Sequence, residues 1–104
     1  MKANDFHVNI INGKDFISEI LEAVKKGTLK EPFYPKDIKK AVPGWGIRTY
    51  IQFPWKHCLQ NKDLDTTALF YYIGEDYPEP KNPIYQNRLY RLLRNSDVNQ
   101  FLVN

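Results

Sequence analysis

The most regular pattern of apolar and polar positions lies near the N-terminus, in KDFISEILEAVKKG, residues 14–27. Five apolar side chains there recur at the spacing of one helix face: Phe16, Ile17, Ile20, Leu21 and Val24. Acidic residues come early and lysines late, as the helix dipole favours, and Gly27 stands where a helix-ending glycine is expected. The pattern predicts a helix that ends just before Gly27.

A second, shorter pattern follows in YPKDIKKAVPGWG, residues 34–46. Pro35 suits a first helical turn, and Ile38 and Val42 lie one turn apart. Pro43-Gly44 then stops the segment. We therefore expect a short basic helix of about two turns, followed by a tight turn. The preceding TLKEPF reads as an extended connector.

The next stretch, GIRTYIQFPWKHCLQN at residues 46–61, supports two interpretations. An apolar stripe at helical spacing comprises Ile47, Tyr50, Ile51, Pro54, Trp55, Cys58 and Leu59. Pro54 interrupts this helix at a cost of about 3 kcal/mol, and RTYIQF alone also alternates like a strand, with a helix beginning at Pro54. We favour a helix, kinked or in two pieces at Pro54, because the stripe is unbroken and a Pro-Gly turn precedes it.

The C-terminal half predicts a β-hairpin. TTALFYYIG, residues 66–74, is β-branched and aromatic and ends at glycine, which indicates a strand. RLYRLL would supply the return strand, although Asn82-Pro83 and helically spaced apolar residues also permit a helix over residues 84–93. We favour the hairpin because a lone strand is unstable. EDYPEPKNP between them reads as an exposed loop, and SDVNQFLVN as a short tail.

This order of elements predicts an α+β fold, a winged helix-turn-helix with a three-helix core and a β-hairpin wing. The 104 residues, 42% hydrophobic, suit a single domain over residues 1–104 with its core at about 13–94. The lone cysteine, Cys58, excludes an internal disulfide, and we see neither a signal peptide in MKANDFHVN nor an apolar run of membrane-spanning length. We expect a cytoplasmic protein that does not contact a membrane.

The charges are unevenly distributed along the chain, although the net charge is only +3. Residues 35–62 carry six basic residues against one acid, and residues 63–80 carry five acids and no base. Residues 81–104 return to four bases against one acid. The two basic blocks could form one binding face, with the acidic block on the opposite side of the molecule. The alternative is that folding scatters these charges over the surface.

The chain resembles winged helix-turn-helix domains, in particular small modules associated with restriction and modification systems. The resemblance covers roughly residues 15–93 and rests on four loose motifs, none of them a fingerprint: FYPKDIKKAVP, GIRTYI with residues 58–61, ALFYYIG and RLYRLL. It implies binding of double-stranded DNA by the third helix, as a transcriptional regulator or as the recognition part of a larger assembly. Winged helices also serve as protein-interaction modules without DNA binding, and YPEPKNPIY would then be the contact loop.

Arginine can read guanine, glutamine can read adenine, and lysine and threonine can hold phosphates. The candidate DNA-binding residues therefore lie on the polar side of the third helix, on the short basic helix and in the wing: Arg48, Thr49, Gln52, Lys56, His57 and Gln60; Lys36, Lys39 and Lys40; Lys81 and Arg88. For each of them the alternative is a solvated side chain with no partner. A homodimer through VNQFLV is compatible with either function.

Enzymatic chemistry finds little support. His57 and Cys58 are adjacent, so on a helix their side chains diverge by about 100° and form no nucleophile–base pair. Asp63, Asp65 and Glu79-Pro80-Lys81 echo a metal-dependent nuclease, but prolines flank that glutamate. We expect no catalytic residues, no metal and no cofactor, and Cys58 as a small core residue.

Overall fold

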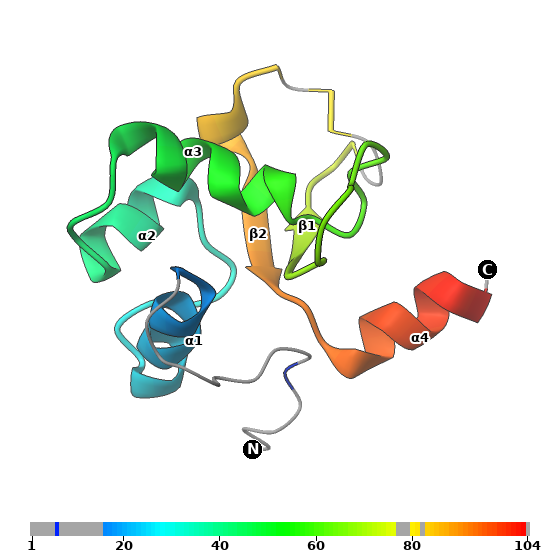
Figure 1. Ribbon diagram of the computed structural model, residues 1–104, viewed down its shortest axis with the longest axis horizontal. Coiled ribbons are helices and arrows are strands. Elements are labelled where there is room, and N and C mark those ends of the chain that lie inside the picture. The colour runs from blue at the N-terminus through cyan, green and yellow to red at the C-terminus, as the bar shows by residue number, and fades with distance from the viewer. Residues whose placement is uncertain (1–5, 7–15, 77–79, 82, 104) are drawn as a thin grey trace.

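The computed structural model describes residues 6, 16–76, 80–81 and 83–103. Its elements are α1 (Phe16–Lys26), α2 (Pro35–Ala41), α3 (Ile47–Lys56), β1 (Phe70–Ile73), the 3-10 turn η2 (Tyr85–Asn87), β2 (Leu89–Leu92) and α4 (Asn95–Val103). Figure 1 shows α1 and α2 to one side of the hairpin, α3 crossing it and α4 beyond its lower end. The fold is mixed α+β, with a helical core and an antiparallel hairpin, as the sequence predicts.

The first helix confirms its sequence pattern. Ile20 and Leu21 are fully buried, and Gly27 follows the helix with a φ of +85°. That left-handed conformation lets the backbone N–H of Thr28 reach the Ala23 carbonyl at 3.0 Å, which closes the helix end. The chain can then turn sharply into the connector.

The hairpin is confirmed, and the helical alternative for residues 84–93 is wrong. Phe70 pairs with Leu92 and Ile73 with Leu89, so the strand is shorter than the expected 66–74. Two further segments flank it: Phe33 exchanges backbone hydrogen bonds of 2.7 and 2.9 Å with Tyr90, and Cys58 bridges Phe70 on the other edge. The connector and the chain after α3 therefore satisfy the outer edges of a two-stranded sheet that would be marginal alone.

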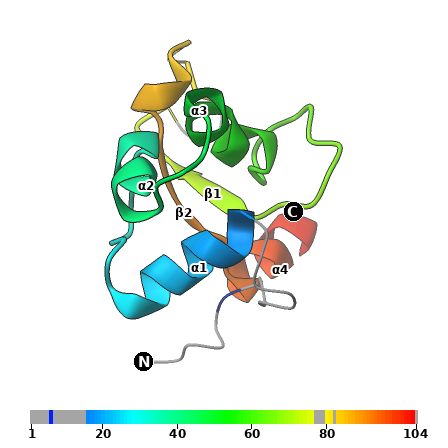
Figure 2. The ribbon, with the colours of Figure 1, turned by 60° about the vertical axis from the view of Figure 1, so that its left-hand side comes forward.

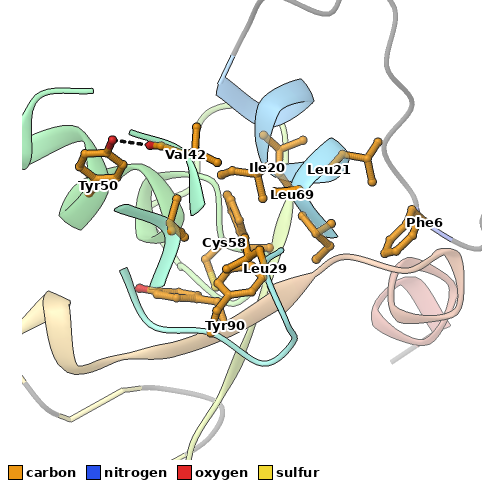
Figure 3. Close-up of a cluster of buried hydrophobic side chains, with 14 of the residues drawn as sticks. Phe6, Ile20, Leu21, Leu29, Val42, Tyr50, Cys58, Leu69 and Tyr90 are labelled. Atoms are coloured by element: carbon orange, nitrogen blue, oxygen red, sulfur yellow. Dashed lines mark hydrogen bonds between the residues drawn. The ribbon is translucent and has the colours of Figure 1, made fainter. Parts of the chain in front are cut away.

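The core lies where α1, α2 and α3 meet the inner face of the hairpin. Figure 3 shows side chains of these elements and of the segments that follow α2 and α3 converging there, including Ile20, Val42, Cys58 and Tyr90. Phe33, Phe70 and Tyr90 have no exposed surface, and their rings meet edge-on at centroid distances of 6.1–6.3 Å. These aromatic contacts couple the sheet edges to the helices.

One expectation for the C-terminal part is corrected. Residues 95–103 form helix α4, not a tail; the side chains of Phe101 and Leu102 lie outside the described residues. The expected loop at 75–83 falls partly outside them as well, at 77–79 and 82. None of the helices in the described ranges combines the length and apolar character that a bilayer crossing requires.

Two ion pairs join the end of β2 to its surroundings. Arg91 binds both carboxylate oxygens of Asp97 at 2.7 and 2.9 Å, and Asp97 also accepts the Arg94 backbone N–H at 2.8 Å, at the start of α4. Arg94 in turn pairs with Glu31 of the connector at 2.6 Å. Arg91 and Arg94, which the sequence places in the second basic block, therefore neutralise nearby carboxylates inside the fold.

The Asp97 carboxylate makes stability depend on acid pH. Burial alone would raise the pKa of Asp97, but the Arg91 side chain and the Arg94 N–H outweigh it and hold the pKa below 3.8. A lowered folded-state pKa gives stability that is present above the unfolded value and is lost as the pH falls through the folded one. We expect Asp97→Asn to cost about 1–3 kcal/mol at pH 6, a difference that shrinks toward pH 2. Urea unfolding across this range checks it; a difference that is equal at both ends contradicts the assignment.

Candidate nucleic-acid interface

Helix α3 presents one face to the core and the opposite face to solvent. Tyr50 and Pro54 are buried, whereas Arg48, Gln52 and Lys56 are exposed. The exposed three, here called the α3 ridge, follow one another at i, i+4 and i+8 and span about 12 Å of helix. Figure 2, which looks nearly along the helix, shows α3 at the periphery of the molecule next to α2.

Pro54 lies inside a continuous helix, so the strand interpretation of RTYIQF is wrong. Proline cannot donate to the carbonyl of Tyr50 and crowds it, at a cost of about 3 kcal/mol in a helix interior. Pro54 is fully buried, and the helix still continues to Lys56 with the His57 N–H bonded to Phe53 at 3.2 Å. Burial of the ring offsets part of that cost.

Tyr50 connects α3 to the turn that precedes it. Its hydroxyl donates to the Val42 carbonyl and accepts the Trp45 N–H at 3.0 Å, and its ring stacks on Trp45 at 4.9 Å. Gly44 supplies the positive φ of +108° that this turn needs. Because Tyr50 is held at both ends of its side chain, the rotation of α3 about its axis is fixed and the α3 ridge faces outward.

Helix α2 packs beside α3 and carries three exposed lysines, Lys36, Lys39 and Lys40. Its one acid, Asp37, accepts the Tyr34 backbone N–H at 2.9 Å at the start of the helix. This contact uses the carboxylate as a cap at the positive end of the helix dipole. The two neighbouring helices thus display the cations of the first basic block.

The expected site residues after α3 lie elsewhere than on its polar face. The helix ends at Lys56 because the following backbone pairs with Phe70: the Leu59 N–H donates to the Phe70 carbonyl at 2.9 Å. Gln60 therefore points to the hairpin, where its amide bonds the N–H and carbonyl of Tyr72 at 2.9 and 3.1 Å. His57, half-buried, places Nδ1 3.0 Å from the Thr67 carbonyl oxygen.

Arg88 is buried and not displayed by the wing. Its guanidinium lies 4.7 Å from the ring centroid of Trp55 and 4.2 Å from that of Tyr85. This cation–π sandwich attaches η2 to the flank of α3. Arg88 thus supports the position of α3, whereas Lys81 is exposed and Thr49 of α3 is half-buried.

The Cys58 thiol has a structural environment. It has no exposed surface, burial raises its pKa to about 12, and it lies 3.3 Å from the Gln60 side-chain oxygen. A thiol so far from its reactive thiolate form is a poor nucleophile. The expectation that Cys58 is a small core residue is confirmed.

Two features of this surface were not anticipated from the sequence. Ile47, assigned to the buried stripe, is 56% exposed because it begins α3 beyond the edge of the core. The Trp55–Arg88–Tyr85 sandwich joins Trp55 to two residues too distant from it in the chain for periodicity to connect them. The available signal was an arginine directly before the first apolar residue of β2.

No family model, no curated protein and no solved structure matches this chain. Within the described ranges, no three His, Cys, Asp or Glu side chains come together as ligands for a metal ion. The candidate site is therefore defined by the geometry of α2, α3 and η2.

The Tyr50 hydroxyl offers a direct test of how α3 is positioned. Tyr50→Phe leaves the Val42 carbonyl and the Trp45 N–H without this partner, so we expect a loss of about 1–2 kcal/mol in unfolding free energy. Tyr85→Phe is the control, since its half-exposed ring keeps its stacking on Arg88. Urea titration monitored by tryptophan fluorescence measures both, and equal stability of the two variants would contradict the role of the hydroxyl.

Proposed function

We propose that this protein binds double-stranded DNA as a winged helix-turn-helix domain, with α3 in the major groove. The observation that carries the proposal is the α3 ridge: two cations and an amide exposed along one line of a helix that contains no acidic residue. In this role the protein would act as a transcriptional regulator or as the DNA-recognition component of a larger assembly.

The dimensions of α3 suit such a complex. A major groove about 12 Å wide admits an α-helix, and the ten residues of α3 extend about 15 Å. Arg48 would read guanine O6 and N7, Gln52 would read adenine, and Lys56 and Thr49 would contact phosphate oxygens. Each contact uses a side chain on or beside the outward face.

Two neighbouring elements would extend the interface along the DNA backbone. Lys36, Lys39 and Lys40 project from α2, next to α3, where phosphates flank the groove. Lys81 would contact a phosphate from the wing loop. Gln60 and Arg88 have no place in this interface, because the fold already employs their side chains. His57 remains a half-buried candidate at its edge.

An exposed apolar pair favours a second candidate function, a protein-interaction module of the same fold. Ile84 immediately precedes η2 and Tyr85 begins it; their side chains are 48% and 37% exposed, and η2 lies beside α3. An apolar surface of this kind would bind a protein partner with little dependence on salt. Phosphate contacts instead give an affinity that falls steeply with ionic strength, so salt separates the two functions.

The test is fluorescence anisotropy of a labelled mixed-sequence duplex at about 50 and 200 mM salt. We expect micromolar or tighter binding at the lower salt and, for about four phosphate contacts, a loss on the order of a hundredfold at the higher. Arg48→Ala/Lys56→Ala should abolish binding at both salts, since it removes both cations of the α3 ridge.

The matched control is Lys25→Ala/Lys30→Ala, which removes the same charge from exposed positions on α1 and its connector. These two lysines line a pocket with Phe6, Glu31 and Arg94 to which neither α2 nor α3 contributes, so this variant should retain most of the binding. Absence of binding at low salt would contradict the proposal. Equal losses in the two variants would also do so, because they would indicate attraction to net charge alone.

A further inference from the structure

We propose that Ile47 makes α3 selective for base pairs that carry a 5-methyl group in the major groove, beside a guanine held by Arg48. The inference rests on the proposed function, because it requires α3 to lie in the groove. It adds an apolar feature of the base edge that the helix would prefer and that no residue of the α3 ridge can recognise.

The position of Ile47 carries the argument. Its 56% exposure is the highest among the large hydrophobic side chains that the structure describes. A single exposed apolar side chain needs no explanation by itself, but Ile47 is the first residue of α3 and directly precedes Arg48, and the N-terminal residues of a recognition helix are the ones that contact base edges. Ile51, one turn later, is half-buried, so an aliphatic strip borders the α3 ridge from the core outward.

The chemistry of the groove supplies a matching group. The 5-methyl of thymine is the apolar feature on a major-groove base edge, and apolar side chains contact it there. Ile47 and Arg48 are separated by about 1.5 Å along the helix and about 100° around it, so their side chains can reach neighbouring base pairs about 3.4 Å apart. The preferred step therefore pairs a 5-methylpyrimidine with an adjacent guanine.

A protein partner is a poorer fit to this surface. Charged residues are depleted from the buried centre of protein–protein interfaces, yet the exposed residues that follow Ile47 on α3 include two cations, Arg48 and Lys56. Burial of those cations against a protein would need acidic partners at each of them. The groove places phosphates and acceptor-rich base edges at the same positions.

The test begins with selection of high-affinity sequences from a randomised duplex pool, with the pool itself as reference. Selected duplexes are then made in two pairs. The first pair carries thymine or deoxyuridine at the selected pyrimidine positions, and the second carries 5-methylcytosine or cytosine at the same positions. Loss of one methyl contact should weaken binding about fourfold, and a gained methyl should strengthen it similarly. If the methyl group changes the affinity only in the thymine pair, the helix selects thymine. If it changes the affinity in both pairs, the helix selects a 5-methyl group on either base.

Ile47→Ser should abolish the difference between methylated and unmethylated duplexes while it retains salt-dependent binding. Ile84 is a similarly exposed aliphatic side chain next to η2, so Ile84→Ser should retain the difference in affinity between methylated and unmethylated duplexes. Equal affinity of the wild type for all forms overturns the inference and leaves the proposed function intact, as does a pool from which no sequence is enriched. No duplex binding at about 50 mM salt overturns both proposals.

Discussion

The attachment of Tyr50 to the turn before α3 is the constraint on which the rest of the candidate surface depends. One buried hydroxyl bonds backbone groups of Val42 and Trp45, and the ring stacks on Trp45. These contacts fix both the spacing between α2 and α3 and the rotation of α3 about its axis. The buried Pro54 then lies on the same side as Tyr50, so Arg48, Gln52 and Lys56 have no route to the core and face solvent.

The fold separates its arginines and lysines by task. Arg91 and Arg94 bind carboxylates through bidentate or paired contacts, and Arg88 is sandwiched between two aromatic rings. These uses suit the planar guanidinium, which stacks and pairs in fixed geometry. The lysines of α2 are instead exposed. The C-terminal basic block is thus largely structural, and of the two basic blocks the first displays most of the exposed cations.

Periodicity predicted the elements whose burial is decided locally. Helices α1 and α2 follow directly from their apolar spacing, from Gly27 and from Pro35, whereas the hairpin followed from the need of the first strand for a partner. The stripe through Pro54 identified α3, but it extended the helix past Lys56, because backbone pairing of Leu59 with Phe70 is a tertiary effect that no local pattern reports. Residues 95–103 were missed for the same reason, since ion pairing of Asp97 with Arg91 organises the start of α4.

The candidate site was predictable in part. Exposure of Arg48, Gln52 and Lys56 followed from helical phase alone, and so did that of the α2 lysines. Gln60 and Arg88 could not be placed from sequence, because their amide and guanidinium groups satisfy partners supplied by distant segments.

The most direct test of the central claim, that α3 and α2 bind DNA, is a ¹H–¹⁵N NMR titration of the protein with a short duplex at low salt. The account predicts that the largest shift changes map to α3 and to the lysines of α2. Changes confined to η2 or α4, or none at all, would contradict it.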